Sequence, residues 1–336
     1  MRLFIVKSFF ILLIILLPVS LLITLCDKIY KDEIFNDNIE YKLPALIKDH
    51  QPFDLIIAGD SAAERGIIPE IIERETGLNT MNIAGPGCGI VATNNLFKKY
   101  PFLINRNTTL FITATIFQVN DGAIDTIGKS KATMVNLSLL EKIKIFKWKT
   151  LDIIPIYKEM LLKLFSGFLY QKLFDVQAPQ SGRALLYSRD YKIDSKGFFP
   201  TEGKDDSGPA IALNPDGTTN HPWYKNINLT GVRWKIFKRT LAQLDKLGCK
   251  IIIIKPPASP SFKQNVQGSF IDQAEKEYSE NMRKETLKYP NISFIDFYDE
   301  IDSGLEEIHF YDIQHTNKSG AKVFTKSLLK YLSYSN

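Results

Sequence analysis

Five short and almost entirely apolar runs constrain the fold of this chain more than any other feature of its sequence. They occupy residues 55–58, 80–83, 109–116, 250–255 and 292–295. A strand this apolar needs cover on both of its faces, which is typical of parallel sheets packed between helices.

Amphipathic helical patterns separate these runs. One begins at about residue 61, and another covers roughly 234–247 and ends at Gly248, where a helix C-cap is expected. Two more cover roughly 271–288 and 320–332. The alternation predicts an α/β fold with a five-stranded parallel sheet, whose functional loops follow the carboxyl ends of the strands.

The N-terminus is predicted to be a membrane anchor. Residues 9–26 are uncharged and apolar, about as long as a bilayer-spanning helix requires, and Arg2 and Lys7 precede them. The basic flank favours a cytoplasmic N-terminus with the rest of the chain outside. No small-residue cleavage site follows, and the residue before Cys26 is not small, so we predict an uncleaved signal anchor in residues 1–30 rather than a lipoprotein.

Three further parts follow the anchor. Residues 31–50 are charged and mixed, and we expect a juxtamembrane segment there. Residues 51–336 form the predicted globular domain. An insertion at about 123–230 interrupts its strand–helix rhythm with a basic helical part and a part rich in turn residues. We expect the insertion to shape a substrate groove or a partner surface.

The composition excludes several functional classes. The chain has 336 residues, 45% of them hydrophobic, which suffices for a large core. Its net charge of +5 is spread among interspersed charges, without the basic run of a nucleic-acid binder. Three cysteines and four histidines are too scattered for a disulfide framework or a zinc site. We therefore expect no nucleic acid, no metal and no cofactor.

Polar and glycine-rich blocks follow the first three runs, and another precedes the last helix. Because the carboxyl ends of parallel strands meet at one edge of a sheet, we expect these blocks to lie together. In chain order they are Gly59-Asp60-Ser61, Gly87, Asn120-Asp121-Gly122 and Asp312-Ile313-Gln314-His315.

Each block by itself has a purely structural interpretation. Gly-Asp-Ser could cap a helix N-terminus, and the last block could simply start the final helix. Asn120 and Gly87 could be turn residues, with Gly85 and Gly89 as competing glycines. The conjunction of all four, in order and at successive strand ends, favours a catalytic site.

Together the blocks resemble the pattern of the SGNH hydrolases, also called GDSL-like, a family named after its Ser, Gly, Asn and His. The resemblance covers roughly residues 52–336 with the insertion set aside. It implies a flavodoxin-like three-layer α/β/α sandwich, in agreement with the strand pattern. Two positions depart from the family: Gln118 replaces the glycine of the third block, and Ala62 replaces the leucine of the GDSL label.

The resemblance also implies a role for each matching residue. Ser61 is the expected nucleophile, His315 the general base and Asp312 the residue that orients the imidazole. The backbone N–H groups of Ser61 and Gly87, with the Asn120 side chain, are the expected oxyanion hole. A serine hydroxyl is a poor nucleophile until an imidazole takes its proton, which is why the reaction needs these residue types.

The anchor, the insertion and the Asp-x-x-His block are similar to a membrane-anchored branch of the family. That branch includes alginate O-acetyltransferase-like proteins and the D-alanyl transfer protein of teichoic acids. The similarity implies a single-pass protein of the bacterial cytoplasmic membrane with its catalytic domain on the periplasmic or extracytoplasmic side. It would O-acetylate a cell-surface or secreted polysaccharide through an acyl-Ser61 intermediate, with a membrane-bound O-acyltransferase as its partner.

Two alternatives remain open at this point. A carbohydrate esterase or deacetylase would use the same triad with water, and a non-catalytic member would be a scaffold in surface-polymer assembly. Aromatic residues of the insertion could form a sugar platform or pack the insertion onto the core. They are Tyr187, Tyr191, Phe198, Phe199, Trp223 and Tyr224.

Overall fold

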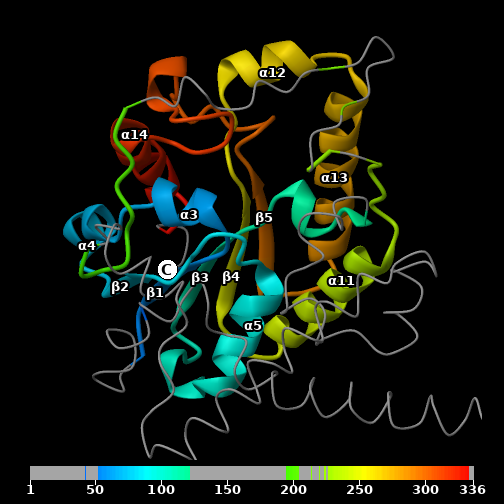
Figure 1. Cartoon of the computed structure of the whole chain (residues 1–336). Coiled ribbons are helices and arrows are strands. Elements are labelled where there is room, and N and C mark those ends of the chain that lie inside the picture. Colours follow the sequence, from blue (N-terminus) through cyan, green and yellow to red (C-terminus); the bar gives the residue numbers. More distant parts are fainter. Residues whose placement is uncertain are drawn as a thin grey trace, which may run out of the picture. The chain divides into compact units, whose positions relative to one another are not determined.

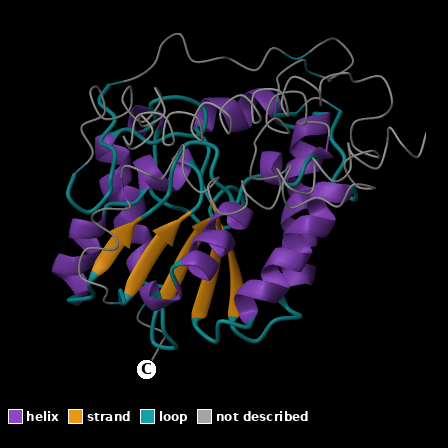
Figure 2. Cartoon of the chain, turned by 60° about the horizontal axis from the view of Figure 1, so that its bottom comes forward, coloured by secondary structure: helices purple, strands orange, loops and turns teal. Residues whose placement is uncertain are grey.

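A five-stranded sheet forms the centre of the protein, as a computed structural model shows (Figures 1 and 2). All neighbouring strands are parallel, and their order is β2-β1-β3-β4-β5. The strands are β1 Leu55–Ala58, β2 Thr80–Asn82, β3 Thr109–Thr113, β4 Lys250–Lys255 and β5 Ile292–Asp296. The predicted five-stranded parallel sheet is therefore confirmed. This order is that of flavodoxin-type sheets, in which ligands bind where the winding reverses, between β1 and β3.

The structure describes only part of the chain. The described residues are 42, 52–121, 194–203, 213, 219, 223–224 and 226–332. The predicted anchor at 1–30, most of the segment 31–50 and most of the insertion lie outside them. Among the helices that the structure describes, none is long and apolar enough to cross a membrane.

Successive residues of a strand point to opposite sides of the sheet. Because nearly all of these residues are apolar, both faces of the sheet are apolar. In β1, Ile56 belongs to one buried cluster, while Leu55 and Ile57 belong to another. The same alternation recurs in β4, where Ile251 and Ile253 face the first cluster. This two-sided burial is what the uniformly apolar runs predicted.

Helices cover the two faces in separate groups (Figure 1). The first cluster is completed by α5, α11, α12 and α13, and the second by α3, α4 and α14. The bounds of these helices are α3 Ser61–Gly66, α4 Pro69–Thr76, α5 Ile90–Lys99, α11 Val232–Asp245, α12 Pro260–Val266, α13 Phe270–Thr286 and α14 Lys318–Leu329. The sheet thus forms the middle layer of three.

The third strand is shorter than its apolar run suggested. The run extends to residue 116, but β3 ends at Thr113 and a short 3-10 helix, Ile116–Gln118, follows. The chain leaves the sheet here because Thr113, Thr115 and Gln118 turn their side chains toward a carboxylate at the end of β1. Apolarity alone could not reveal this polar attraction.

The turn after β1 requires glycine at position 59. Gly59 has a φ of 117°, which L-residues rarely adopt. A Cβ atom there would lie 2.3 Å from Thr113 Oγ1 and 2.8 Å from the Thr113 backbone nitrogen. Close packing of β1 against β3 at the site therefore depends on this glycine.

We expect Gly59→Ala to lower the free energy of unfolding by at least about 2 kcal/mol, because it adds a steric clash to backbone strain. Gly77→Ala is the matched control, since Gly77 has a φ of 76° but open space around its Cα. Strain alone should cost about 1 kcal/mol at that position. Urea denaturation of both variants checks this, and equal losses would show that the contact with Thr113 is unimportant.

Candidate active site

Ser61 stands at the carboxyl end of β1 as the first residue of α3. Asp60 is the N-cap of this helix, and its carboxylate accepts the N–H of Ala62 at 3.1 Å. The Ser61 side chain remains only half-buried. The strand, the tight turn and the helix together present the Ser61 hydroxyl at the edge where functional loops are expected.

A hydrogen-bonded chain joins three of the predicted residues. Ser61 Oγ lies 2.7 Å from His315 Nε2, and His315 Nδ1 lies 2.6 Å from Asp312 Oδ2. An ionised carboxylate can only accept, so the proton between His315 and Asp312 belongs to Nδ1. In the neutral imidazole the Nε2 lone pair then faces the Ser61 hydroxyl. This arrangement lets an imidazole take the proton of a serine hydroxyl.

Asp312 is held in place by the backbone of its own loop. Its Oδ1 accepts the N–H groups of Gln314 at 2.9 Å and His315 at 2.8 Å. Burial acts to raise the pKa of Asp312, but the hydrogen bonds and charge of His315, with these two N–H groups, outweigh it and lower the pKa. Asp312 therefore carries its negative charge next to the imidazole at neutral pH.

The loop at 310–316 that carries both residues is closed at its base and pinned from outside. Phe310 and Thr316 form an antiparallel bridge, and within the loop the Tyr311 N–H donates to the His315 carbonyl at 2.7 Å. From the segment after β4, the Ser259 N–H donates to the Ile313 carbonyl at 3.0 Å. The following helix α14 is capped by Asn317, whose side chain accepts from Gly320 N. The Asp-x-x-His block thus lies before the helix cap.

Asp60, the residue before Ser61, is buried and accepts several hydrogen bonds. Its carboxylate accepts from the hydroxyls of Thr113 at 2.9 Å and Thr115 at 3.0 Å, and from the amide of Gln118 at 3.0 Å. Burial raises the pKa of Asp60, opposed by these hydrogen bonds and by the charge of His315. The network binds the turn that holds Ser61 to the segment that follows β3.

Gln118, which departs from the family pattern, has a clear structural role. Its Nε2 donates to Asp60 and also to the Thr113 carbonyl, at 3.3 Å. Its Oε1 lies where a Cβ atom on Gly89 would approach within 2.9 Å. The amide fills space that a larger residue at position 89 would occupy. Sequence reasoning treated Gln118 as a departure and missed this support of Asp60.

Gly87 adopts a left-handed conformation with a φ of 67° in the loop after β2. Of the competing glycines, Gly85 donates its N–H to the carbonyl of Gly59 at 3.2 Å, so that group is already paired. Within the described part of the chain, the N–H groups of Gly87 and Ser61 donate to no protein acceptor. Both therefore remain able to bind a substrate oxygen.

Asn120 is fully buried, and its side chain holds a neighbouring segment. The Nδ2 group donates to the Trp223 carbonyl at 3.0 Å, and Oδ1 accepts the Asn228 N–H at 2.8 Å. These bonds fasten the end of the insertion to the segment after β3. The predicted oxyanion role of Asn120 stays a prediction.

The aromatic residues expected in the insertion divide into two groups. Phe198 and Tyr224 are 4% and 1% exposed and pack into the core, so the packing alternative holds for them. Phe199 and Trp223 are partly exposed, and Phe199 stacks on the guanidinium of Arg65. Tyr187 and Tyr191 lie outside the described residues.

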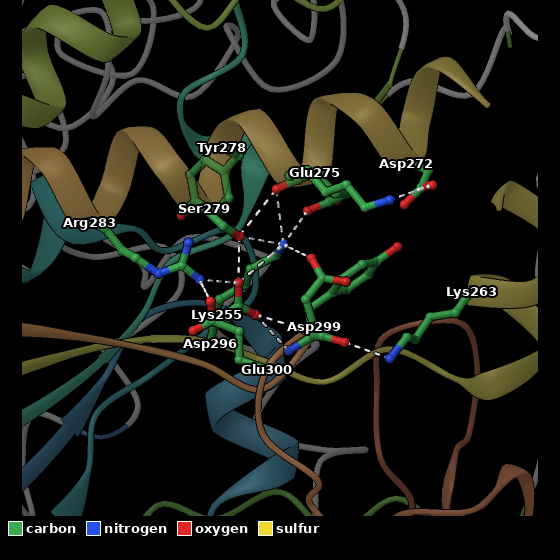
Figure 3. A network of polar contacts seen from close by, with 12 residues as sticks. Lys255, Lys263, Asp272, Glu275, Tyr278, Ser279, Arg283, Asp296, Asp299 and Glu300 are labelled. Carbon is green, nitrogen blue, oxygen red and sulfur yellow. Dashed lines mark hydrogen bonds and ion pairs between the residues drawn. The ribbon is translucent and has the colours of Figure 1, made fainter. Parts of the chain in front are cut away.

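A buried charge network joins the ends of β4 and β5 to helix α13 (Figure 3). Lys255, at the end of β4, is 2% exposed, and its Nζ lies 3.1 Å from Glu275 and 3.5 Å from Asp299. It also donates to the Ser279 hydroxyl at 2.9 Å, and Ser279 in turn donates to Asp296. Sequence reasoning missed this network because a lysine that flanks an apolar strand looks like a solvated strand end.

Neither of two searches for sequence relatives gives a match: no family model fits the chain, and no curated protein is similar to it. Among solved structures, the chain is similar to one described as a candidate platelet activating factor from Streptococcus pneumonia. The match has 12% sequence identity and a TM-score of 0.40 and covers 90% of this chain and 92% of that chain. A likeness of this degree shows neither a site nor an activity.

The residues of the candidate site are not arranged as metal ligands. Across the described ranges, no three His, Cys, Asp or Glu side chains converge as they would around an ion. The described thiols of Cys88 and Cys249 are both buried, and burial raises the pKa of Cys88 to about 12. A buried thiol with so high a pKa is a poor ligand or nucleophile.

We expect the stability difference between wild type and Asp312→Asn to depend on pH. The pKa of Asp312 is lowered in the folded protein from an ordinary value of 3.8, so its ionised form stabilises the fold. That contribution is fully present above the unfolded pKa and is lost as the pH falls through the folded pKa. Chemical denaturation between pH 7 and pH 2 should show the difference shrinking below about pH 4. A difference independent of pH would contradict a stabilising role of the ionised Asp312 carboxylate.

Asn120→Ala should lower the free energy of unfolding by about 1–3 kcal/mol, because the partly buried Trp223 carbonyl and Asn228 N–H both lose their hydrogen bond to this side chain. Asn228→Ala is the control, since that side chain accepts from the Thr230 N–H and hydroxyl at an exposed position. Urea denaturation measures both variants. Wild-type stability of Asn120→Ala would mean that its side chain does not support the fold.

Proposed function

We propose that the chain is a serine-dependent enzyme that moves an acyl group through an acyl-Ser61 intermediate. The single observation that carries this proposal is the hydrogen-bonded chain from Ser61 through His315 to Asp312. A surface serine has no need for a partly buried imidazole whose second nitrogen is fixed by a carboxylate. Nucleophilic catalysis needs that combination.

The proposed first half-reaction begins when Ser61 Oγ attacks the carbonyl carbon of an ester. His315 Nε2 takes the hydroxyl proton, and Asp312 stabilises the imidazolium that forms. The negative oxygen of the tetrahedral intermediate would be bound by the N–H groups of Ser61 and Gly87, with Asn120 as the third predicted donor. Collapse of the intermediate expels the alcohol, which takes its proton from His315.

In the second half-reaction an acceptor hydroxyl replaces that alcohol. His315 takes the proton of the acceptor as its oxygen attacks the acyl-Ser61 carbonyl, and the proton then returns to Ser61 Oγ. If the acceptor is a sugar hydroxyl, the enzyme is a transferase. If it is water, the enzyme is an esterase or deacetylase with the same residues.

The finer proposal is an extracytoplasmic acyltransferase of SGNH type that O-acetylates a cell-surface or secreted polysaccharide. The predicted anchor at 1–30 supports it, since a tethered enzyme suits a polymer made or exported at the membrane. In this proposal a membrane-bound O-acyltransferase supplies the acetyl group. The carbohydrate esterase and the non-catalytic scaffold are the alternatives.

We expect a fluorophosphonate probe to label the full-length wild type at one residue, and to label Ser61→Ala not at all. His315→Ala should slow labelling by on the order of a thousandfold or more, because the hydroxyl then keeps its proton. Ser327→Ala is the control, since that hydroxyl donates to the Phe324 carbonyl within α14. Mass spectrometry of the modified peptide identifies the site.

The outcome also separates the alternatives. Failure of the wild type to react with the probe would leave the scaffold as the better proposal. With a labelled enzyme, an acetyl donor and a glycan oligomer, acetyl transfer to the glycan indicates the transferase, and release of free acetate alone indicates the esterase.

A further inference from the structure

The phenol of Tyr224 links the loop of the proposed general base to the buried charge network. Gln314 Nε2 donates to the Tyr224 hydroxyl at 3.2 Å, and that hydroxyl donates to Glu275 Oε1 at 2.9 Å. Burial raises the pKa of Tyr224 well above its usual value, so the phenol keeps its proton. It can therefore accept from Gln314 and donate to Glu275 at the same time.

The far side of this link is rigidly held. Glu275 lies on α13, and its Oε2 pairs with Lys255 Nζ at 3.1 Å (Figure 3). Lys255 is fixed in turn by the Ser279 hydroxyl at 2.9 Å and by the face of the Tyr298 ring, whose centroid is 4.1 Å away. A buried charge with so many partners cannot shift without leaving one of them unpaired.

Tyr224 is also held through its own segment. The carbonyl of its neighbour Trp223 accepts a hydrogen bond from the Asn120 side chain, and the Asn228 N–H donates to the same side chain. The ring of Tyr224 is 1% exposed and packs against Phe262, with 6.0 Å between ring centroids. The phenol oxygen is thus held in place and can restrain Gln314 through their hydrogen bond.

Gln314 connects the Tyr224 hydroxyl to the residues of the proposed triad. It lies between Asp312 and His315, and its own N–H donates to Asp312 Oδ1 at 2.9 Å. If its side chain were released, the turn that sets the distance from His315 to Ser61 would lose an external support. Misplacement of a base by even about 1 Å can cost up to a hundredfold in rate.

We propose that Tyr224 is a positioning residue for His315, acting through Gln314, and that Glu275 and Lys255 anchor it. This inference rests on the proposed function, because it presumes that His315 acts as a base toward Ser61. It gives the end of the insertion a role in catalysis, because the segment that contains Tyr224 would hold the general base in position.

The test compares Tyr224→Phe with Tyr278→Phe in the full-length chain. Both substitutions remove one buried phenol oxygen near the same network, but the Tyr278 hydroxyl donates to the Ala114 carbonyl and not to the 310–316 loop. With 4-nitrophenyl acetate as substrate, Tyr224→Phe should lower kcat by roughly tenfold and leave KM within about twofold. Tyr278→Phe should leave kcat unchanged, even though both variants lose thermal stability.

A double-mutant cycle with Gln314→Met sharpens the test, since methionine keeps the length of the side chain and removes its donor. If Tyr224 acts through Gln314, the double variant should be no slower than the slower single variant. Multiplied losses would overturn the coupling, and equal effects of Tyr224→Phe and Tyr278→Phe on kcat would overturn the positioning role. Should Tyr224→Phe not fold, Gln314→Met alone must show the loss of kcat at constant KM. An unlabelled, inactive wild type would instead overturn the proposed function itself.

Discussion

Asp60 is a buried carboxylate that accepts hydrogen bonds from both sides of the junction between β1 and β3. It caps α3, which orients Ser61, and it accepts hydrogen bonds from Thr113 at the end of β3 and from Thr115 and Gln118 beyond that strand. Burying an ionisable group is costly unless its oxygens are satisfied, so these residues hold one another in place. The site is therefore built at the point where a flavodoxin-type sheet reverses its winding.

Much of the fold could be predicted because short apolar runs and helical periodicity indicate which residues are buried. The run 250–255 is short, rich in isoleucine and followed by two prolines, which favours a strand covered on both faces, and the helix over 234–247 has the period of a one-sided apolar surface. The end of β3 could not be predicted in this way. The chain leaves the sheet there because of polar contacts with Asp60, a residue more than fifty positions earlier in the sequence.

The candidate site shows the same division. Ser61, Asp312 and His315 could be proposed because the first follows the first predicted strand and the other two precede the last predicted helix, in the order of the family pattern that the chain resembles. The structure brings their side chains within hydrogen-bond distance. The contacts of Asn120 and Lys255 could not be foreseen. Both depend on partners brought near by the fold, and a turn asparagine or a strand-flanking lysine has the same local sequence whether it is buried or solvated.

The contact between Gln118 and Gly89 has a consequence for how this lineage can change. While glutamine stands at 118, any side chain at 89 would push against the amide that steadies Asp60. A homologue with a small residue at 118 has no such restriction. The two positions are therefore coupled, because a side chain at 89 would displace the amide that donates to Asp60 unless a smaller residue stands at 118.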